Sequence, residues 1–575
     1  MRIAHCILAA AIAAAPAAKG AETVKAKRVK RGEVRGKVYD VWAVSSLAKV
    51  FKDDARPTRA ADAVELTAAR NEHEAAQIVF KAIEPVAELR GEWGSLKLKA
   101  PAGRSRDKRG HEIPADHLSW SFVGYVPVAR NSQNTPAEEL VRQAPADFPD
   151  PLLEETTIAV PAGQCQPLWL TVRVPQDAPA GRYDGSFRLI TASGADEVPV
   201  TLQVFDFEVP DQRHIPVTNW FTPGRIARQY HVEPWSEAHW ELLGRYADNM
   251  REHRQNVCLT PLSLIDITQK PDGTFAFDFA RFDRWIELFE TRGGMDFFEG
   301  GHVAGRDGGW ETTRIKFNDI TVTLTDGTSK ALPGEQVIRP LMSALQAHLE
   351  QKGLLDRFWI HIADEPIDKC LASWEEKSRI VHEAAPKIKR IDAIEAPEFH
   401  GTLEIWVPRL DHLHDWYERY KSAQKEQGAE LWFYTCLFPN QTYPNRLVDY
   451  SLLKTRILHW MNWHFDAPGY LHWGLNYWTD DPFASTESGR LPPGDAFIIY
   501  PGKDGPLNSI RWEAMRDGLE DYEYLYLLAE RTGSREQSTA FTGRLIRSII
   551  DYENDPELLL KTRQEIAEAI LKAGK

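Results

Sequence analysis

Cysteine is scarce in this sequence, which has five cysteines among 575 residues. Cys6 lies near the N-terminus, and Cys165, Cys258, Cys370 and Cys436 are far apart, without a CxxC pair. This spacing excludes a dense disulfide framework and argues against a zinc site. It leaves room for at most two isolated disulfides.

Positive charge is in the minority, and long apolar segments are lacking. The 83 acidic residues outnumber the 69 lysines and arginines, and the formal net charge is −14. A protein that follows the phosphates of a nucleic acid needs the opposite sign, so we expect no nucleic-acid partner. No segment after the N-terminal one has eighteen uncharged apolar residues, so we predict no transmembrane segment.

Metal-binding motifs are missing as well. The sequence contains no HExxH motif, which is the signature of many zinc hydrolases. Its one HxH pair, His412 and His414, lies in a helix-like segment, where residues two apart do not face each other. We therefore expect neither a metal nor another cofactor.

Aromatic residues are numerous by contrast, with 19 tryptophans and 17 tyrosines. An exposed aromatic ring can serve as a stacking platform for a sugar, whereas a buried one fills the core. We expect most of these side chains to be buried.

The first residues have the pattern of a secretory signal peptide. Arg2 carries positive charge, residues 7–15 form a short apolar run, and small residues follow up to Ala18. The run is too short to span a bilayer. We predict a signal peptide at residues 1–18, a basic linker at residues 19–37, and a periplasmic or secreted mature protein.

Short β-type segments dominate residues 38–212. Residues 75–80, 168–174 and 198–204 alternate or run apolar over the length of a strand, and turn-forming clusters such as residues 179–182 separate them. Short strands with this punctuation predict a β-sandwich domain over residues 38–212.

After residue 212, strand-like segments alternate with amphipathic helical ones. This rhythm predicts a (β/α)8 TIM-type barrel at residues 213–535, with closing helices in a C-terminal segment at residues 536–575. An insertion at residues 306–333 interrupts the third unit, and an open doubly wound sheet is the structural alternative. The eight predicted strands are residues 217–221, 256–261, 295–300, 358–364, 391–396, 403–407, 431–436 and 470–478.

The fourth predicted strand runs into two adjacent carboxylates, Asp364 and Glu365, which Pro366 follows. In a barrel of this type the active site lies at the C-terminal ends of the strands. Adjacent carboxylates in a partly buried site repel each other, so the pKa of one should rise and provide one proton donor beside one lasting anion. Alternatively, Asp364 caps the following helix and Glu365 is solvated.

Four stretches of the sequence resemble glycoside hydrolase family 123. The catalytic strand of that family is similar to IHIADEP at residues 360–366, and the resemblance extends to RNEHEAAQ at 70–77, WGLNYW at 473–478 and the helical run at 509–524. It covers most of the chain from residue 40 to residue 530. The resemblance implies a β-sandwich, a (β/α)8 barrel and a β-N-acetylgalactosaminidase-like activity on a glycan or glycoconjugate.

The resemblance also implies a retaining, substrate-assisted mechanism in which the 2-acetamido oxygen of the sugar attacks its own anomeric carbon. Asp364 would orient the acetamido N–H and stabilise the oxazolinium intermediate. Glu365 would protonate the leaving oxygen and then activate water. This division of roles matches the expectation of one proton donor beside one carboxylate that stays charged.

Four further residues are predicted to bind the substrate. Tyr434 would donate a hydrogen bond to the acetamido oxygen, and Trp406 would form an apolar wall for the N-acetyl methyl group. Asn476 and Trp478 lie two apart and so share a face of a strand, where Asn476 would bind a hydroxyl and Trp478 would stack on the ring. For each of the four, packing in the core is the alternative.

Two other functions remain open, and one cluster is assigned to structure. A glycosidase of the same fold could act on a different sugar, or the protein could bind glycans without catalysis. Charged residues of the segment after residue 508 are expected to form a structural ion network, with contact to the site as the alternative for Arg516. The network residues are Arg511, Glu513, Arg516, Asp517, Glu520 and Asp521.

Overall fold

The computed structural model describes residues 38–99, 111–399 and 403–574. The predicted signal peptide (1–18) and basic linker (19–37) lie outside these ranges. Within them, no helix combines the length and the apolar character that crossing a membrane requires. Cys165, Cys258, Cys370 and Cys436 are all buried, and none of them forms a disulfide.

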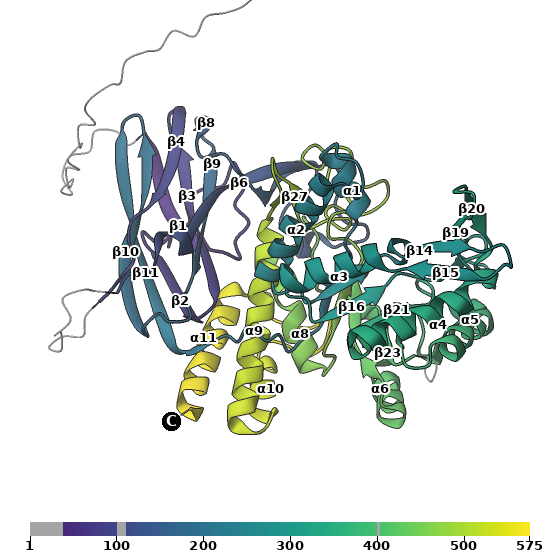
Figure 1. Cartoon of the computed structure of the whole chain (residues 1–575). Helices are drawn as coiled ribbons and strands as arrows, with labels where there is room; N and C mark the ends of the chain where they lie inside the picture. Colours follow the sequence, from purple (N-terminus) through teal and green to yellow (C-terminus); the bar gives the residue numbers. More distant parts are fainter. Residues whose placement is uncertain (1–37, 100–110, 400–402, 575) are drawn as a thin grey trace, which may run out of the picture. The chain divides into compact units, whose positions relative to one another are not determined.

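The N-terminal part consists of two β-sheets that share one buried core (Figure 1). The strands follow the predicted pattern, since β3, β9 and β11 contain most of the apolar segments at 75–80, 168–174 and 198–204. Alternate residues such as Ile78, Leu168 and Leu202 point into this core. The first sheet has the order β1 (Tyr39–Ser45), β3 (His73–Ala82), β9 (Cys165–Arg173), β6 (Leu118–Val128) and β7 (Ala146–Leu152). The second has the order β2 (Val64–Arg70), β11 (Gly194–Glu208), β10 (Gly181–Thr191), β4 (Val86–Trp93) and β8 (Ile158–Val160), with β5 (Lys97–Leu98) beside β10.

The C-terminal part is built on parallel strands, and each of the eight predicted ranges overlaps at least one of them. Its strands are short and largely buried on both faces, as parallel strands are when other elements cover both sides. A six-stranded sheet has the order β13 (Val257–Thr260), β16 (Phe297–Gly300), β21 (Phe358–His361), β22 (Lys389–Ile394), β23 (Ile405–Pro408) and β24 (Glu430–Leu431). A three-stranded sheet has the order β12 (Val217–Asn219), β26 (Tyr470–His472) and β25 (Phe433–Thr435).

The two parallel sheets touch at both of their ends. At one end, the N–H of Trp432 donates to the carbonyl oxygen of Trp406 over 2.8 Å. At the other end, the N–H of Asn256 donates to the carbonyl oxygen of Val217 over 3.4 Å. Strands from both sheets contribute to one small apolar cluster, which includes Trp359 and Leu471.

Helices connect most of these strands, as the alternating rhythm predicts. Ser236 caps the first turn of α2 by accepting the N–H of His239, and α4 and α6 end at glycines with left-handed backbone. The connection after β25 contains two short helices. The helices are α2 (Glu237–Glu252), α3 (Ala280–Thr291), α4 (Gly334–Lys352), α5 (Leu371–Ala384), α6 (Leu410–Gln427), α7 (Leu452–Arg456) and α8 (Leu458–His464).

The insertion at residues 306–333 is larger than predicted, because it joins a hairpin from the preceding unit. Its first part is the antiparallel pair β17 (Ala304–Arg306) and β18 (Ile315–Phe317), and we call residues 304–317 the insertion hairpin. The second part, β19 (Ile320–Leu324) and β20 (Ser329–Leu332), pairs with an unpredicted hairpin, β14 (Asp266–Gln269) and β15 (Phe275–Asp278).

The predicted ion network is confirmed on the long helix α9 (Ile510–Thr532). Arg516 pairs with Glu513 over 2.7 Å, and Arg511 pairs with Asp150 of the N-terminal part over 2.8 Å. Asp521 binds two arginines, one of which comes from the closing helix α11 (Pro556–Ala573). These buried charges are paired, as charges inside a protein have to be.

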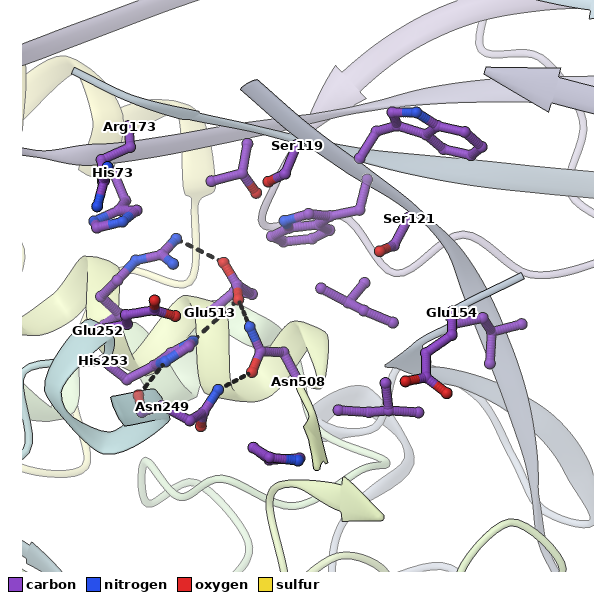
Figure 2. A pocket seen from close by; sticks show the side chains of 18 of the residues that line it. His73, Ser119, Ser121, Glu154, Arg173, Asn249, Glu252, His253, Asn508 and Glu513 are labelled. Atoms are coloured by element: carbon purple, nitrogen blue, oxygen red, sulfur yellow. Dashed lines mark hydrogen bonds and ion pairs between the residues drawn. The ribbon is translucent and has the colours of Figure 1, made fainter. Parts of the chain in front are cut away.

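Part of this network lines a polar cavity of about 440 Å³, which Figure 2 shows. His73 and Arg173 come from the first sheet, His253 from the end of α2, and Glu513 from α9. His253 lies 3.0 Å from Glu513 and hydrogen-bonds to it, and Arg516 lies on the same wall. Arg516 therefore forms part of the wall of this cavity and does not lie at the strand ends beside Asp364.

Candidate active site

Asp364 and Glu365 lie just beyond β21, at the point where its hydrogen-bond ladder ends. The N–H groups of Ile362 and Ala363 donate to the two carboxylate oxygens of Asp392, each over 3.0 Å, and not to a neighbouring strand. Asp392 is fully buried on β22. Because its carboxylate replaces the partner strand, the chain can leave the sheet here and present the two acidic side chains at the carboxyl edge.

The backbone of Glu365 confirms that the regular strand is broken. Its φ angle is +44°, in the left-handed region that residues other than glycine seldom adopt. Arg306 holds this conformation, because its Nη2 donates to the carbonyl oxygen of Glu365 over 2.5 Å. In a regular strand adjacent side chains face opposite ways, so this turn is what allows the two carboxylates to interact.

Glu365 is the more enclosed carboxyl group of the two. Its Oε1 accepts a hydrogen bond from the hydroxyl of Tyr434 on β25 over 2.5 Å. Burial raises the pKa of Glu365 and the neighbouring charge of Asp364 raises it further, against the opposing effects of Tyr434 and two arginines. A carboxyl group with a raised pKa is suited to donate a proton near neutral pH.

Tyr434 links Glu365 to a third acidic residue, Glu395, which follows β22. The hydroxyl oxygen of Tyr434 lies 3.1 Å from Oε1 of Glu395, and Arg409 pairs with Glu395 over 3.0 Å. Burial raises the pKa of Glu395, and burial keeps Tyr434 protonated by raising its pKa well above 10. The Tyr434 hydroxyl has one hydrogen and can donate it to only one of the two carboxylates. The Glu365–Tyr434–Glu395 chain can therefore hold one additional proton.

Asp364 is open to solvent, with 60% of its side chain exposed. The pKa of Asp364 is nevertheless raised, because surrounding protein removes part of its hydration, and the charges of His361 and Arg306 offset only part of this effect. His302, just after β16, has its Nε2 atom 3.9 Å from Oδ1 of Asp364. Burial lowers the pKa of His302 to about 3, so its imidazole is neutral.

A buried network lies beneath the two carboxylates. His361 of β21 contacts Asp392 through Nδ1 over 3.2 Å and Glu299 through Nε2 over 2.9 Å. Thr218 of β12 donates to Glu299 in turn. Burial alone would lower the pKa of His361, but the two carboxylates together outweigh it and raise the pKa to about 9. His361 is therefore an imidazolium at neutral pH.

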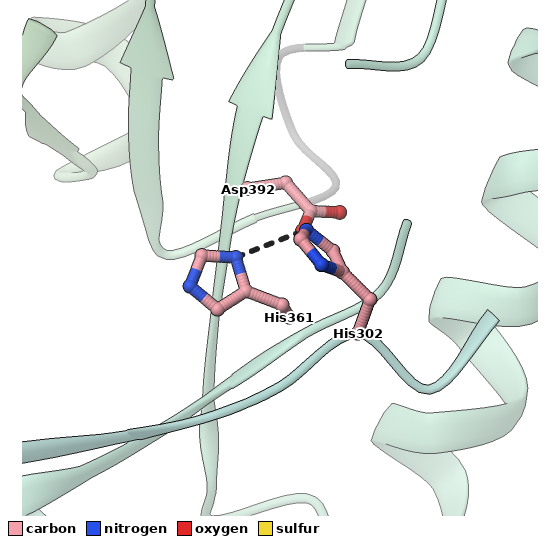
Figure 3. A group of neighbouring side chains, drawn as sticks. All are labelled: His302, His361 and Asp392. Carbon is pink, nitrogen blue, oxygen red and sulfur yellow. Dashed lines mark hydrogen bonds and ion pairs between the residues drawn. The ribbon is translucent and has the colours of Figure 1, made fainter. Parts of the chain in front are cut away.

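Figure 3 shows the one group of residues in the described part of the chain whose ligand atoms could hold a metal ion, namely His302, His361 and Asp392. These atoms lie within 4.8 Å of one another. Both ring nitrogens of His361 and both oxygens of Asp392 already take part in hydrogen bonds. These three residues are therefore better explained as a hydrogen-bonded support for the end of β21 than as a metal-binding site.

The structure does not bring three of the predicted substrate-binding residues to these carboxylates. Trp406 points into the outer core, since its neighbours Ile405 and Val407 face the interior cluster, and its indole N–H donates to a backbone carbonyl. Asn476 bonds both backbone groups of a single residue, and Trp478 donates to a backbone carbonyl. All three are buried with their polar atoms paired, so we correct their assignment to core residues.

Several residues of the site were missed in the sequence, although a signal for them exists. His302 follows the third predicted strand, Glu395 ends the fifth and Arg409 follows the sixth. The rule that barrel sites lie at strand ends, applied to every strand, selects all three. Arg306 carries no such signal, because it lies in an insertion.

Two family models match the chain. Residues 220–528, more than half of the chain, match the model of the glycoside hydrolase 123 catalytic domain. Residues 45–191 match the model of the glycoside hydrolase 123 N-terminal domain. No protein with a curated description matches.

Among the solved structures similar to this chain, one shares its fold and another is only weakly similar. One, described as giving the details of glycolipid glycan hydrolysis, is a family 123 glycoside hydrolase from Clostridium perfringens. It has a TM-score of 0.75 at 16% identity, over 93% of this chain and 98% of that chain, so the two share a fold. An endo-β-1,4-mannanase from Thermotoga petrophila reaches a TM-score of 0.32 at 12% identity, over 55% of this chain and 77% of that chain.

Proposed function

Because the chain belongs to glycoside hydrolase family 123, we propose that it is a retaining hydrolase that releases terminal β-linked N-acetylgalactosamine from a glycan or glycoconjugate. Asp364 and Glu365 are its catalytic residues, and the acetamido group of the substrate is the nucleophile. One observation carries this proposal. A carboxylate open to water stands beside a more enclosed carboxyl group with a raised pKa and a hydrogen bond to Tyr434.

The first step breaks the glycosidic bond. The acetamido oxygen attacks the anomeric carbon, a carbon–oxygen bond forms, and the bond from that carbon to the leaving oxygen breaks. Glu365 gives its proton to the leaving oxygen. Asp364 accepts the acetamido N–H and stabilises the positive charge of the oxazolinium intermediate.

The second step uses the same two residues in reverse. The carboxylate of Glu365 takes a proton from a water molecule while the water oxygen bonds to the anomeric carbon. The bond between that carbon and the acetamido oxygen breaks, which regenerates the acetamido group. Two inversions at one carbon give net retention, and Glu365 ends protonated as it began.

The surroundings of each carboxylate support this division of roles. Of two coupled acids, the one more open to water keeps the negative charge, and here that residue is Asp364. Tyr434 contacts only Oε1 of Glu365, and no hydrogen bond from the described residues reaches Oε2. That oxygen is the one available to a leaving group.

The architecture belongs to the same proposal. We infer that the six-stranded and three-stranded parallel sheets are two arcs of one (β/α)8 barrel with Asp364 and Glu365 at its carboxyl end. The hydrogen bonds that join the sheets at both ends support this closure, and so does the cluster they share. An experimental structure with a bound substrate analogue would test it.

The experiment is a turnover assay on the mature protein with aryl β-N-acetylgalactosaminide and aryl β-N-acetylglucosaminide. We expect hydrolysis of the galacto compound, release of the β-anomer as first product by NMR, and inhibition by a thiazoline mimic of the oxazoline. Glu365→Gln is the control and should reduce this turnover, because Glu365 also activates the water in the second step. Hydrolysis of a glycoside without an acetamido group, with no effect of the thiazoline, would instead identify a glycosidase of another specificity.

The cellular location is a separate proposal. We propose export to the periplasm or medium, on the basis of the signal-peptide pattern at residues 1–18. Fractionation of expressing cells, with a variant lacking those residues as control, tests it. Equal retention of both forms in the cytoplasm would refute it.

A further inference from the structure

The insertion hairpin (residues 304–317) is fastened directly to the strand end that carries Asp364 and Glu365. The N–H of Ala304 donates to the carbonyl oxygen of Ile362 over 2.8 Å. On its other strand, Ile315 exchanges two hydrogen bonds with the Ser373 hydroxyl, of 2.9 and 3.1 Å. These bonds tie the hairpin to the end of the catalytic strand on one side and to α5 on the other.

The tip of the hairpin is ordered by its own hydrogen bonds. The N–H of Asp307 donates to the carbonyl oxygen of Arg314 over 2.9 Å, and the N–H of Thr312 donates to that of Gly309 over 3.0 Å. Lys369, which follows the catalytic strand, pairs with Glu311 at the tip. The residues between Asp307 and Arg314 are therefore held in a fixed position beside Asp364 and Glu365.

Arg306, at the base of the tip, has an unused donor. Its Nη2 donates to the carbonyl oxygen of Glu365, and its positive charge lowers the pKa of both Asp364 and Glu365. Its Nη1 is buried and has no hydrogen-bond partner in the described part of the chain. Leaving a charged donor buried and unsatisfied is costly, so this atom is suited to a ligand oxygen.

Trp310, at the tip, offers an open aromatic face beside that donor. The guanidinium of Arg306 lies 3.8 Å from the ring centroid of Trp310 and covers one face. Half of the side chain, 51%, remains exposed. Among the described residues, Trp310 is the only tryptophan in the group of exposed large hydrophobic side chains. A flat apolar surface next to a hydrogen-bond donor suits a pyranose, which has an apolar C–H face and a hydroxyl rim.

We propose that Arg306 and Trp310 form a binding site for the sugar on the leaving-group side of the scissile bond. This inference rests on the proposed function, in which Glu365 protonates the leaving oxygen. Arg306 binds the backbone of Glu365, whereas the side-chain neighbour at Asp364 is His302. The ligand is therefore the pyranose to which the terminal N-acetylgalactosamine is attached, as in an oligosaccharide or a glycolipid glycan.

Two substrates with the same donor sugar test the site. One is a disaccharide in which N-acetylgalactosamine is β-linked to galactose. The other is N-acetylgalactosaminyl β-fluoride, whose leaving group is too small to reach Trp310. For Trp310→Ala we expect the ratio of kcat/KM for the disaccharide to kcat/KM for the fluoride to fall about tenfold, as expected for loss of one aromatic contact. Most of the change should appear in KM.

Two further variants separate binding from folding. Trp310→Phe keeps an aromatic face and should restore most of the ratio. Ile83→Ala removes a similarly exposed side chain, 56%, on the N-terminal part, and should leave both substrates unaffected. Thermal unfolding of each variant checks that the fold is retained.

The outcomes are distinguishable. If wild type hydrolyses both substrates and Trp310→Ala leaves the ratio unchanged, or lowers both values equally, the leaving-group site is refuted while the proposed function stands. If wild type hydrolyses neither substrate, the proposed function fails and this inference fails with it. A lowered ratio that Trp310→Phe restores supports the site.

Discussion

The hydroxyl of Tyr434 lies 2.5 Å from Oε1 of Glu365 and 3.1 Å from Oε1 of Glu395. A tyrosine was predicted here as a donor to the substrate, but the structure gives its hydroxyl two protein partners. We therefore expect Tyr434 to act on the proposed reaction through the proton affinity of Glu365.

The pH dependence of activity should report this contact. Tyr434 lowers the pKa of Glu365 by hydrogen-bonding to it, so Tyr434→Phe should raise that pKa. In the proposed mechanism Glu365 has to be protonated in the first step, so activity should be lost as pH rises through its pKa. The alkaline limb of the kcat/KM profile should move to higher pH, and kcat should fall about tenfold. A limb that moves to lower pH would contradict this reading.

The two carboxylates should respond differently to the leaving group. Glu365→Gln should lower kcat/KM for a disaccharide at least about 100-fold, and much less for an aryl glycoside whose leaving group needs little protonation. Asp364→Asn should lower kcat/KM for both substrates, because Asp364 is proposed to act on the acetamido group that both contain. Steady-state kinetics on the matched pair measures this, and equal sensitivity of Glu365→Gln to both would reassign the acid.

Asp392 should hold the strand end in place. Asp392→Asn replaces one acceptor oxygen by a donor, which conflicts with the N–H groups of Ile362 and Ala363. It also leaves the His361 imidazolium with one carboxylate fewer. We expect a loss of about 3 kcal/mol in the free energy of unfolding, together with a fall in kcat at little-changed KM.

A surface variant provides the control for that measurement. Asp62→Asn removes an ion pair with Arg56 in which the Asp62 side chain is 74% exposed, and should cost about 1 kcal/mol or less. Denaturant unfolding of both variants gives the comparison. Equal losses of unfolding free energy in the two variants would mean that Asp392 does not hold the strand end in place.

The stability of the protein should also depend on pH through His361. Its pKa is about 9 in the folded chain against an ordinary 6.5. A raised folded-state pKa means that the stabilisation is fully present below about pH 6.5 and is lost as pH rises through about 9. Thermal unfolding of wild type should therefore decline over this window, and His361→Gln should remove that part of the decline. A variant curve parallel to wild type would refute the imidazolium assignment.

The sequence by itself determined the order of elements and selected Asp364 and Glu365 as the candidate pair. Apolar segments of strand length, separated by helical periodicity, are a local property of the chain, so all eight ranges overlap a strand. Asp364 and Glu365 were identified because an apolar strand that ends in two carboxylates is a chemical anomaly visible in seven letters. The matching family models were anticipated from this stretch together with residues 70–77, 473–478 and 509–524.

Only the tertiary structure decided which side chains meet the pair. Trp406, Asn476 and Trp478 looked suitable by residue type, but the pleat of a short strand and the packing of loops turned them into the core. Tyr434 reaches the Glu365 carboxylate from β25. Asp392 of β22 binds the backbone just before Asp364, and Arg306 of the insertion binds the backbone carbonyl of Glu365. Such contacts depend on the packing of segments far apart in the chain, which local sequence patterns do not encode.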